Sequence, residues 1–100
     1  MKLRAEFAAA AEADVFEIAL RIAEGSVDAA LRWESGVRTA AASLVRFPRR
    51  CPVVSESAFF GREVRRLAYG SYRVLYEIKG DLVVILRVRH GARRRLGEEE

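Results

Sequence analysis

Residue types that build catalytic and metal sites are scarce in this chain of 100 residues. Cys51 is the only cysteine, so neither an internal disulfide nor a multi-thiolate metal site can form. His90 is the only histidine, which leaves one imidazole for acid-base chemistry. Cys51 lies between Arg50 and Pro52 with one distant histidine as a possible base, which favours a plain loop thiol over a nucleophile. We therefore expect no metal and no cofactor.

The chain also lacks long hydrophobic runs. No apolar stretch approaches the roughly 18 residues that a bilayer-spanning helix needs, and charged residues interrupt the N-terminal segment at Arg4 and Glu6. Apolar residues make up 51% of the sequence, enough for one compact core at this length. We expect residues 1–100 to form a single soluble, cytoplasmic domain that has no membrane partner.

Charge is distributed unevenly along the sequence. Residues 62–95 contain ten Lys or Arg and three Asp or Glu, whereas the remaining residues contain eight and eleven. The C-terminal third is therefore strongly basic inside a chain of net charge +4. Such a field favours an anionic partner, either nucleic acid or an acidic polypeptide, although a solvated basic face is its more common use.

The first half of the chain has the pattern of a strand followed by two helices. Residues 2–7 alternate between apolar and charged side chains, which is the period of a half-buried strand. The next apolar positions recur at helical spacing: Ala11, Val15, Ile18 and Ile22. Gly25 is placed to close this helix, and Ser26 can cap a second helix that ends before Pro48. A tight turn between the two makes an antiparallel helical hairpin.

The second helix has its own apolar stripe, formed by Ala30, Trp33, Val37, Ala40 or Ala41, and Leu44. Residues 48–62 show no sustained period and are predicted to be a connecting loop. Three strands follow, over residues 63–69, 72–79 and 82–90, and tight turns at Gly70-Ser71 and Gly80-Asp81 join them into an antiparallel meander. The expected fold is α+β, in the order β-α-α-β-β-β, with the helical hairpin on one face of a four-stranded sheet.

Alternation along the strands predicts which side chains point away from the helices. On the middle strand, Tyr72, Val74, Tyr76 and Ile78 share the packed side, whereas Arg73, Leu75 and Glu77 share the open side. On the last strand, Val84, Leu86 and Val88 form an apolar side, and the opposite side carries Val83, Ile85, Arg87 and Arg89. Arg65 or Arg66 joins this surface, depending on register. We predict a polyanion-binding surface composed of Arg65, Arg73, Arg87, Arg89, Arg93 and Arg94.

His90 ends the last strand among these arginines and has a pKa range suited to general acid-base catalysis. Strand alternation places it on the apolar side, so only a bulge would turn it outward. A histidine at the rim of the sheet, with a structural hydrogen bond, is the more common arrangement.

Two motifs in the second half are specific to one family. They are Tyr-Arg-Val-Leu-Tyr-Glu-Ile at residues 72–78 and Arg-His-Gly-Ala-Arg at residues 89–93, on either side of the Gly80-Asp81 turn. Both resemble the signature of the RelE/ParE superfamily of bacterial toxins. Upstream segments agree with that resemblance, namely residues 11–14, 29–33, 44–48 and 64–67. The resemblance covers nearly the whole chain and implies the fold already expected from the pattern.

This resemblance implies the toxin of a type II toxin-antitoxin module, of the kind that stabilises plasmids. It also implies a cognate antitoxin whose acidic C-terminal segment wraps the toxin to form a hetero-oligomer. RelE-like members cleave mRNA in the ribosomal A site, using basic residues on the open sheet face and, in several branches, a C-terminal Tyr or a His-Tyr pair. ParE-like members lack that set and poison DNA gyrase.

Individual positions can be carried over from the family. Arg73 matches the arginine of the Tyr-Arg strand, Arg93 matches the arginine after the last strand, and His90 falls close to the histidine of the His-Tyr branch. No tyrosine follows Tyr76, so the residue that would relay a proton is absent. This departure favours a ParE-like gyrase inhibitor that catalyses no reaction. The alternatives are a ribosome-dependent endoribonuclease with catalytic His90, Arg73 and Arg93, and a non-toxic binding module on the same fold.

Overall fold

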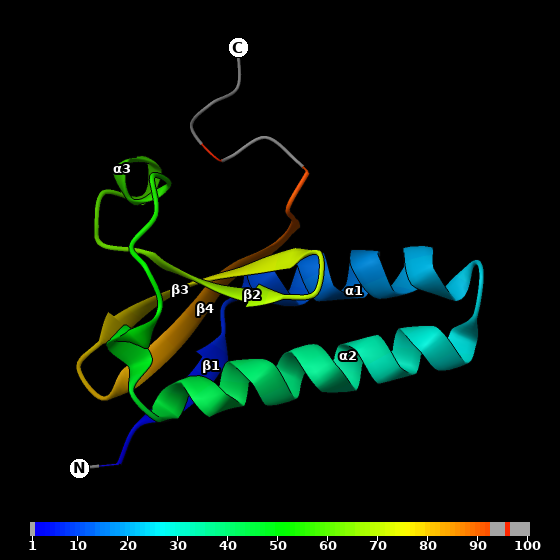
Figure 1. The fold of residues 1–100 in the computed structure, drawn as a ribbon, viewed down its shortest axis with the longest axis horizontal. Helices are drawn as coiled ribbons and strands as arrows, with labels where there is room; N and C mark the ends of the chain where they lie inside the picture. The colour runs from blue at the N-terminus through cyan, green and yellow to red at the C-terminus, as the bar shows by residue number, and fades with distance from the viewer. Residues whose placement is uncertain (1, 93–95, 97–100) are drawn as a thin grey trace.

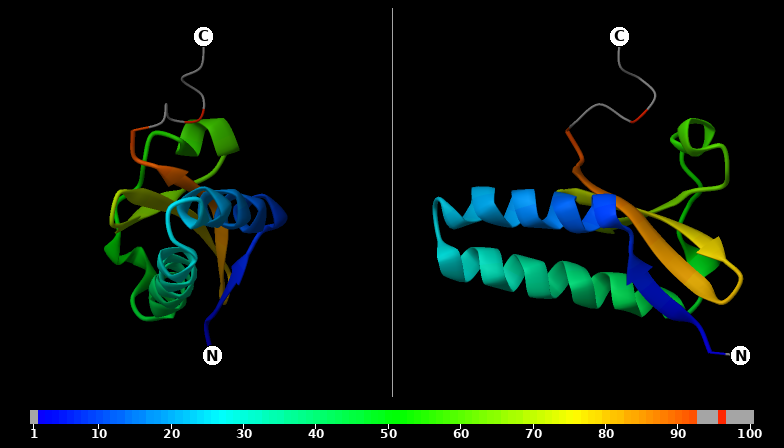
Figure 2. Two further views of the ribbon diagram at one scale, coloured as in Figure 1. Left: turned by 90° about the vertical axis from the view of Figure 1, so that its right-hand side faces the viewer. Right: turned by 180° about the vertical axis from the view of Figure 1, so that it is seen from behind.

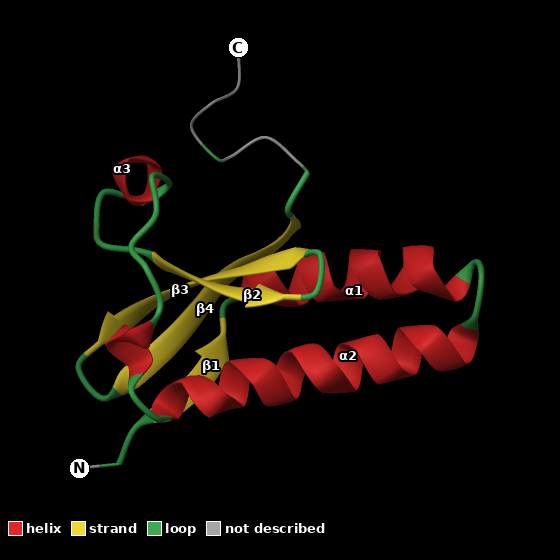
Figure 3. Cartoon of the chain, in the orientation of Figure 1, coloured by secondary structure: helices red, strands yellow, loops and turns green. Residues whose placement is uncertain are grey.

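The computed structural model describes residues 2–92 and residue 96, and it has two helices packed on one face of a four-stranded sheet (Figure 1). The strands and α-helices are β1 (Arg4–Phe7), α1 (Ala9–Ala23), α2 (Val27–Ala42), α3 (Ser57–Phe60), β2 (Arg65–Tyr69), β3 (Tyr72–Lys79) and β4 (Leu82–His90). Figure 3 shows the helical and sheet layers in separate colours. The strand order is β1-β4-β3-β2, with β1 parallel to β4 and the other pairs antiparallel. The predicted α+β fold is confirmed.

The helical hairpin forms where the sequence predicted it. Ser26 caps α2, because its Oγ accepts a hydrogen bond from the backbone N–H of Ala29 at 3.1 Å. α1 ends at Ala23, so Gly25 lies just beyond the helix. Figures 1 and 2 show that the two helices run antiparallel and that the end of the hairpin projects beyond the sheet. No helix among residues 2–92 and 96 has the length and apolar character of a membrane span.

The main core lies between the hairpin and the sheet. Its buried residues from α1 and α2 include Ala11, Val15, Ile18, Val37 and Ala41, and those from β3 and β4 are Val74, Tyr76, Val83, Ile85 and Val88. Trp33 packs against this core and contacts Tyr72 edge-on, with ring centroids 5.2 Å apart. The apolar stripes of both helices therefore have the core role that their spacing predicted.

Gly36 is required by a close contact between α2 and β2. A Cβ atom at this position would lie 1.8 Å from the hydroxyl oxygen of Tyr69. Glycine costs about 1 kcal/mol relative to alanine in a helix interior, so its presence here is explained by the approach of the tyrosine ring rather than by helix formation.

The segment predicted to be an irregular loop is partly ordered into secondary structure. It contains a 3-10 turn at Pro48–Arg50 and the short helix α3, and Val53 forms a β-bridge with Arg65 of β2. Ser57 at the start of α3 binds both backbone groups of Val64: its hydroxyl accepts from N at 2.8 Å and donates to O at 3.1 Å. These bonds attach α3 to the strand that follows it.

The second face of the sheet is covered, and its prediction as an open surface is wrong. A smaller cluster of buried residues lies there, made of Val64, Leu75, Leu86 and Leu96, with Val54, Phe60 and Val84 packed against it. Phe60 contacts Phe59 edge-on with ring centroids 5.1 Å apart, so one ring of this pair packs while Phe59 remains largely exposed. Apolar side chains on this face needed cover, and the segment before β2 supplies it.

A β-bulge in β4 overturns the predicted sides of that strand. Leu75 pairs with Arg87 and Tyr76 pairs with Ile85, which leaves Leu86 without a partner on β3. Val83, Ile85 and Val88 consequently belong to the main core, whereas Val84 and Leu86 belong to the smaller cluster. A period-two pattern cannot reveal an inserted residue, so simple alternation assigned these side chains to the wrong faces.

Candidate functional site

Arg73, on the central strand of the predicted polyanion surface, forms an ion pair inside the protein. Its Nη1 and Nη2 donate to the two carboxylate oxygens of Glu56 at 2.6 and 3.0 Å. The Glu56 side chain is fully buried and that of Arg73 is only 9% exposed. Arg73 lies on the predicted face of β3, but Glu56 already occupies its guanidinium.

Arg87 has a similar structural role. Its Nε and Nη2 donate to the carboxylate of Asp14 in α1, at 2.7 and 2.9 Å. The hydrogen bonds that Arg87 donates to this carboxylate are the largest cause that raises the pKa of Arg87 above its ordinary value. The same carboxylate accepts the backbone N–H of Val88 at 2.9 Å. Arg87 pairs with Leu75 of the smaller cluster and so lies on the predicted face, but its guanidinium is engaged by Asp14 and joins β4 to α1.

Register decides which of two neighbouring arginines lies on the second face. Arg65 pairs with Tyr76, a residue of the main core, whereas Arg66 pairs with Leu75, a residue of the smaller cluster. Arg66 is thus the arginine that shares a face with Arg73. The prediction that Arg65 shares a face with Arg73 is wrong, because Arg65 lies on the opposite side, where its guanidinium donates to the backbone carbonyls of Arg49 and Cys51.

Arg89 and His90 line a small pocket between the end of β4 and α1. The pocket is also lined by Asp14, Glu17, Ile18, Arg21, Tyr72 and Val88. Its volume of about 20 Å³ suits a water molecule rather than a nucleotide. Arg89 pairs with Arg73 in the sheet register and is buried, so it does not form an exposed cationic surface.

His90 is exposed at the rim of the sheet and has a structural hydrogen bond. Its Nδ1 accepts the backbone N–H of Ala92 at 3.0 Å, and its ring contacts Tyr72 edge-on at 5.1 Å. A neutral imidazole has one acceptor nitrogen, and here that nitrogen is engaged. To act as a general base, His90 would first have to release Ala92. The two remaining arginines of the predicted surface, Arg93 and Arg94, lie outside the described residues.

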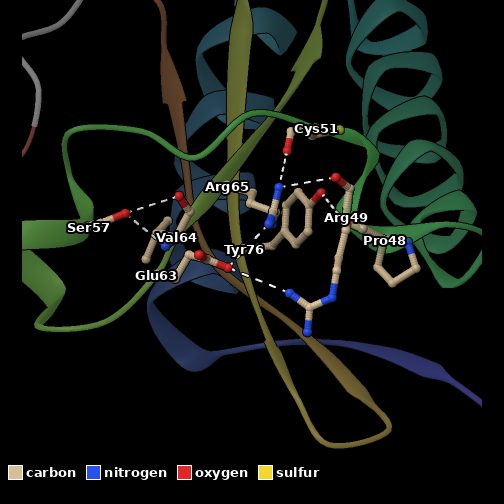
Figure 4. Close-up of polar contacts among 8 residues, drawn as sticks. All are labelled: Pro48, Arg49, Cys51, Ser57, Glu63, Val64, Arg65 and Tyr76. Carbon is tan, nitrogen blue, oxygen red and sulfur yellow. Dashed lines mark hydrogen bonds and ion pairs between the residues drawn. The ribbon is translucent and has the colours of Figure 1, made fainter.

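Sequence reasoning missed a rigid turn after α2. Figure 4 shows Arg65 and Tyr76 pointing toward the backbone of this turn. Tyr76 Oη donates to Pro48 O at 2.5 Å, and Arg65 Nη1 donates to Arg49 O at 3.1 Å and to Cys51 O at 2.6 Å. Burial, the largest cause, and the neighbouring Cys51 thiol raise the pKa of Tyr76, so the phenol remains a donor. Pro48, which ends the helical pattern, was the available local signal for a turn.

A second exposed feature is a set of apolar side chains on the helical hairpin, named here the outer stripe. Four large side chains from α1 and α2 are each more than half exposed there: Phe16, Leu20, Val27 and Leu31. They recur at a spacing of four residues on each helix, which places each pair on one side of its helix. The core stripe of the hairpin was predictable, whereas this second apolar stripe was not singled out.

Comparison with known families identifies a matching domain model. It describes the ParE toxin of the type II toxin-antitoxin system parDE, and it matches residues 5–95 of this chain. Among curated proteins, none matches the chain in sequence.

Two solved structures have similar folds. A chain of the chromosomal ParDE toxin-antitoxin system from P. aeruginosa is 18% identical, with a TM-score of 0.72, covering 89% of this chain and 96% of that one. A chain of the RelBE2 toxin-antitoxin complex from Mycobacterium tuberculosis is 26% identical, with a TM-score of 0.56, covering 90% and 99%. The likeness to the first shows the fold alone at this identity.

Proposed function

The chain belongs to the ParE toxin family and is the toxin of a type II toxin-antitoxin system, and we propose that it arrests growth by binding DNA gyrase. In this proposal the toxin catalyses no reaction. The single observation that supports it most is the buried ion pair of Arg73 with Glu56, at 2.6 Å. A ribosome-dependent nuclease would need that guanidinium to stabilise charge on a phosphate during cleavage.

The acid-base groups available to a nuclease support the same proposal. Cleavage by attack of a 2′-hydroxyl requires a base, an acid for the leaving oxygen, and charge stabilisation. His90 uses its acceptor nitrogen on Ala92, and no tyrosine follows Tyr76 in the sequence. Arg87 is held by Asp14, so two arginines of the predicted polyanion-binding surface, Arg73 and Arg87, have structural ion pairs.

Gyrase assays with the purified toxin test this proposal. We expect inhibition of supercoiling or accumulation of gyrase-linked cut DNA, and intact mRNA on translating ribosomes. A matched variant, His90→Ala, is expected to inhibit gyrase as the parent does. The proposal fails if the toxin leaves gyrase unaffected and produces cuts in ribosomal A sites that disappear in His90→Ala, which would establish the nuclease.

The antitoxin is the second partner, and we propose that it covers the outer stripe of the hairpin. Phe16, Leu20, Val27 and Leu31 together expose an apolar surface that an amphipathic segment can bury. Burying one such side chain contributes about 1.5–3 kcal/mol. The acidic part of the antitoxin would then reach basic groups elsewhere on the toxin. Substitutions at Arg87 or Arg89 would not test this electrostatic contact cleanly, because Arg87 is ion-paired with Asp14 and Arg89 is buried.

Two substitutions on the stripe test the docking surface. Leu20→Asp and Leu31→Asp are each expected to weaken antitoxin binding about tenfold or more, measured by titration calorimetry. Phe59→Asp, at an exposed phenylalanine on α3, is the matched control and should bind as the parent does. If Leu20→Asp and Leu31→Asp bind the antitoxin as tightly as Phe59→Asp and the parent do, the antitoxin docks elsewhere. That outcome would leave the gyrase proposal unaffected.

A further inference from the structure

Phe47 has an unusual conformation for its residue type. Its φ and ψ are 53° and 62°, in the left-handed region, and within the described residues it is the only non-glycine with positive φ. The next residue is Pro48, which disfavours helical conformations at the position before it. Such a backbone costs about 1–3 kcal/mol and persists only where the surroundings fix it.

The surroundings do fix it, from both sides of the chain. Tyr76 and Arg65 bind the carbonyls of residues 48, 49 and 51 from the sheet side. Arg50 closes the other side: its guanidinium donates to Ser43 O at 3.3 Å, to Ser43 Oγ at 3.0 Å and to the carbonyl of Arg46. The turn over residues 46–50, named here the Phe47 turn, is therefore rigid.

The side chain that this turn presents does not stabilise the fold. Phe47 is 81% exposed, more than any other large apolar side chain of the described residues. Glycine would adopt this backbone without strain, so a phenylalanine here costs stability and buries almost nothing. An outlier that folding does not explain indicates a functional contact.

The charges around the ring define the partner. Arg46 is exposed, and among the described residues its side chain has no hydrogen bond or ion pair. The side chain of Arg49 is 69% exposed and lies 3.7 Å from Glu63, at the edge of ion-pair distance. An exposed aromatic ring, with one exposed arginine directly before it in the chain and another two residues after it, can stack on a base while the guanidinium groups bind phosphates.

We propose that the Phe47 turn binds single-stranded or locally unstacked nucleic acid, with a base stacked on Phe47 and phosphates held by Arg46 and Arg49. This surface lies at the opposite end of α2 from the hairpin turn, as Figure 1 shows. The contact is independent of the gyrase proposal, because it requires neither gyrase nor the second face of the sheet. Tyr76, Arg65 and Arg50 are positioning residues for it.

Anisotropy of a short fluorescein-labelled single strand, titrated with the full-length toxin, tests this binding. Phe47→Ala is expected to weaken binding about tenfold or more, and Phe47→Trp to preserve it. Arg46→Gln and Arg49→Gln should each lower the slope of log affinity against log salt by about 0.7, the value for one phosphate on a single strand. Phe59→Ala is the matched control, since Phe59 is 56% exposed but outside the turn.

Phe47→Gly separates function from folding. It should raise the unfolding midpoint, because it relieves the strained backbone, while it weakens binding as much as Phe47→Ala does. The proposal is overturned if the parent does not bind the strand, or if Phe47→Ala and Phe59→Ala bind it equally. It is also overturned if Phe47→Ala weakens binding only to a labelled acidic antitoxin peptide, which would assign the turn to a protein partner.

Discussion

Glu56 and Arg73 form a buried ion pair in which two guanidinium nitrogens meet two carboxylate oxygens. The pair joins the segment before α3 to the central strand β3, across 17 positions of sequence. The carboxylate thus occupies the place at which a phosphate would have to bind if the second face of the sheet were a nuclease site.

Glu56→Gln should destabilise the protein by about 3 kcal/mol, because it leaves the guanidinium of Arg73 buried without a countercharge. Urea unfolding followed by circular dichroism measures this change. The double variant Glu56→Leu with Arg73→Met should recover much of the loss, since it removes both charges. A Glu56→Gln protein as stable as the parent would contradict the burial of this pair.

Gly36→Ala should destabilise the protein in the presence of Tyr69 and stabilise it in its absence. The new Cβ would lie 1.8 Å from the Tyr69 hydroxyl oxygen, so the ring must move. In a Tyr69→Ala background the obstruction is gone, and the higher helix propensity of alanine should add up to about 1 kcal/mol. A thermodynamic cycle over the four proteins checks this, and additive effects would show that the contact is not responsible for the glycine.

Tyr76 should keep its proton in the folded protein well above pH 10. Burial is the main cause that raises its pKa from the ordinary value of 10.0, so in the unfolded chain the phenol ionises at lower pH. Its contribution to stability is therefore complete below pH 10 and is lost as pH rises further. The stability difference between the parent and Tyr76→Phe, from urea unfolding, should shrink above pH 10. A stability difference that stays constant above pH 10 would show that burial does not raise the pKa of the Tyr76 hydroxyl.

Expression without the antitoxin should arrest growth, and co-expression of the cognate antitoxin should restore it. We expect His90→Ala to arrest growth within a few-fold of the parent, because the histidine has a structural bond to Ala92. Loss of a general acid or base typically lowers a rate by about 10² to 10⁴, so the two outcomes are well separated. Abolished toxicity in a folded His90→Ala protein would restore the nuclease alternative.

The sequence predicted elements whose signals are local. The cap at Ser26 and the strand turns at Gly70 and Gly80 depend on neighbours within a few residues, and each was confirmed. The bulge at Leu86 and the packing of the segment before β2 on Leu75 depend on pairing and contacts between segments distant in sequence. Period-two alternation within one strand carries no information about such contacts. Apolar residues in the segment before β2 were the sign that it packs on a surface.

The site residues show the same division. Their basic character and their strands were evident from the sequence, but the partners of Arg73 and Arg87 lie 17 and 73 positions away. Without those partners, every strand arginine looked available to a ligand. Phe47 escaped notice because its importance lies in a backbone conformation that residue type does not reveal.

Asp14 also has a consequence for the free toxin. β1 pairs with β4 only as far as Ile85, so the next part of β4 would offer unpaired amides to a strand of another molecule. The Asp14 carboxylate accepts the N–H of Val88, one of the donors of that stretch. The residue that joins α1 to β4 therefore also occupies a backbone donor that a strand added at this edge would need.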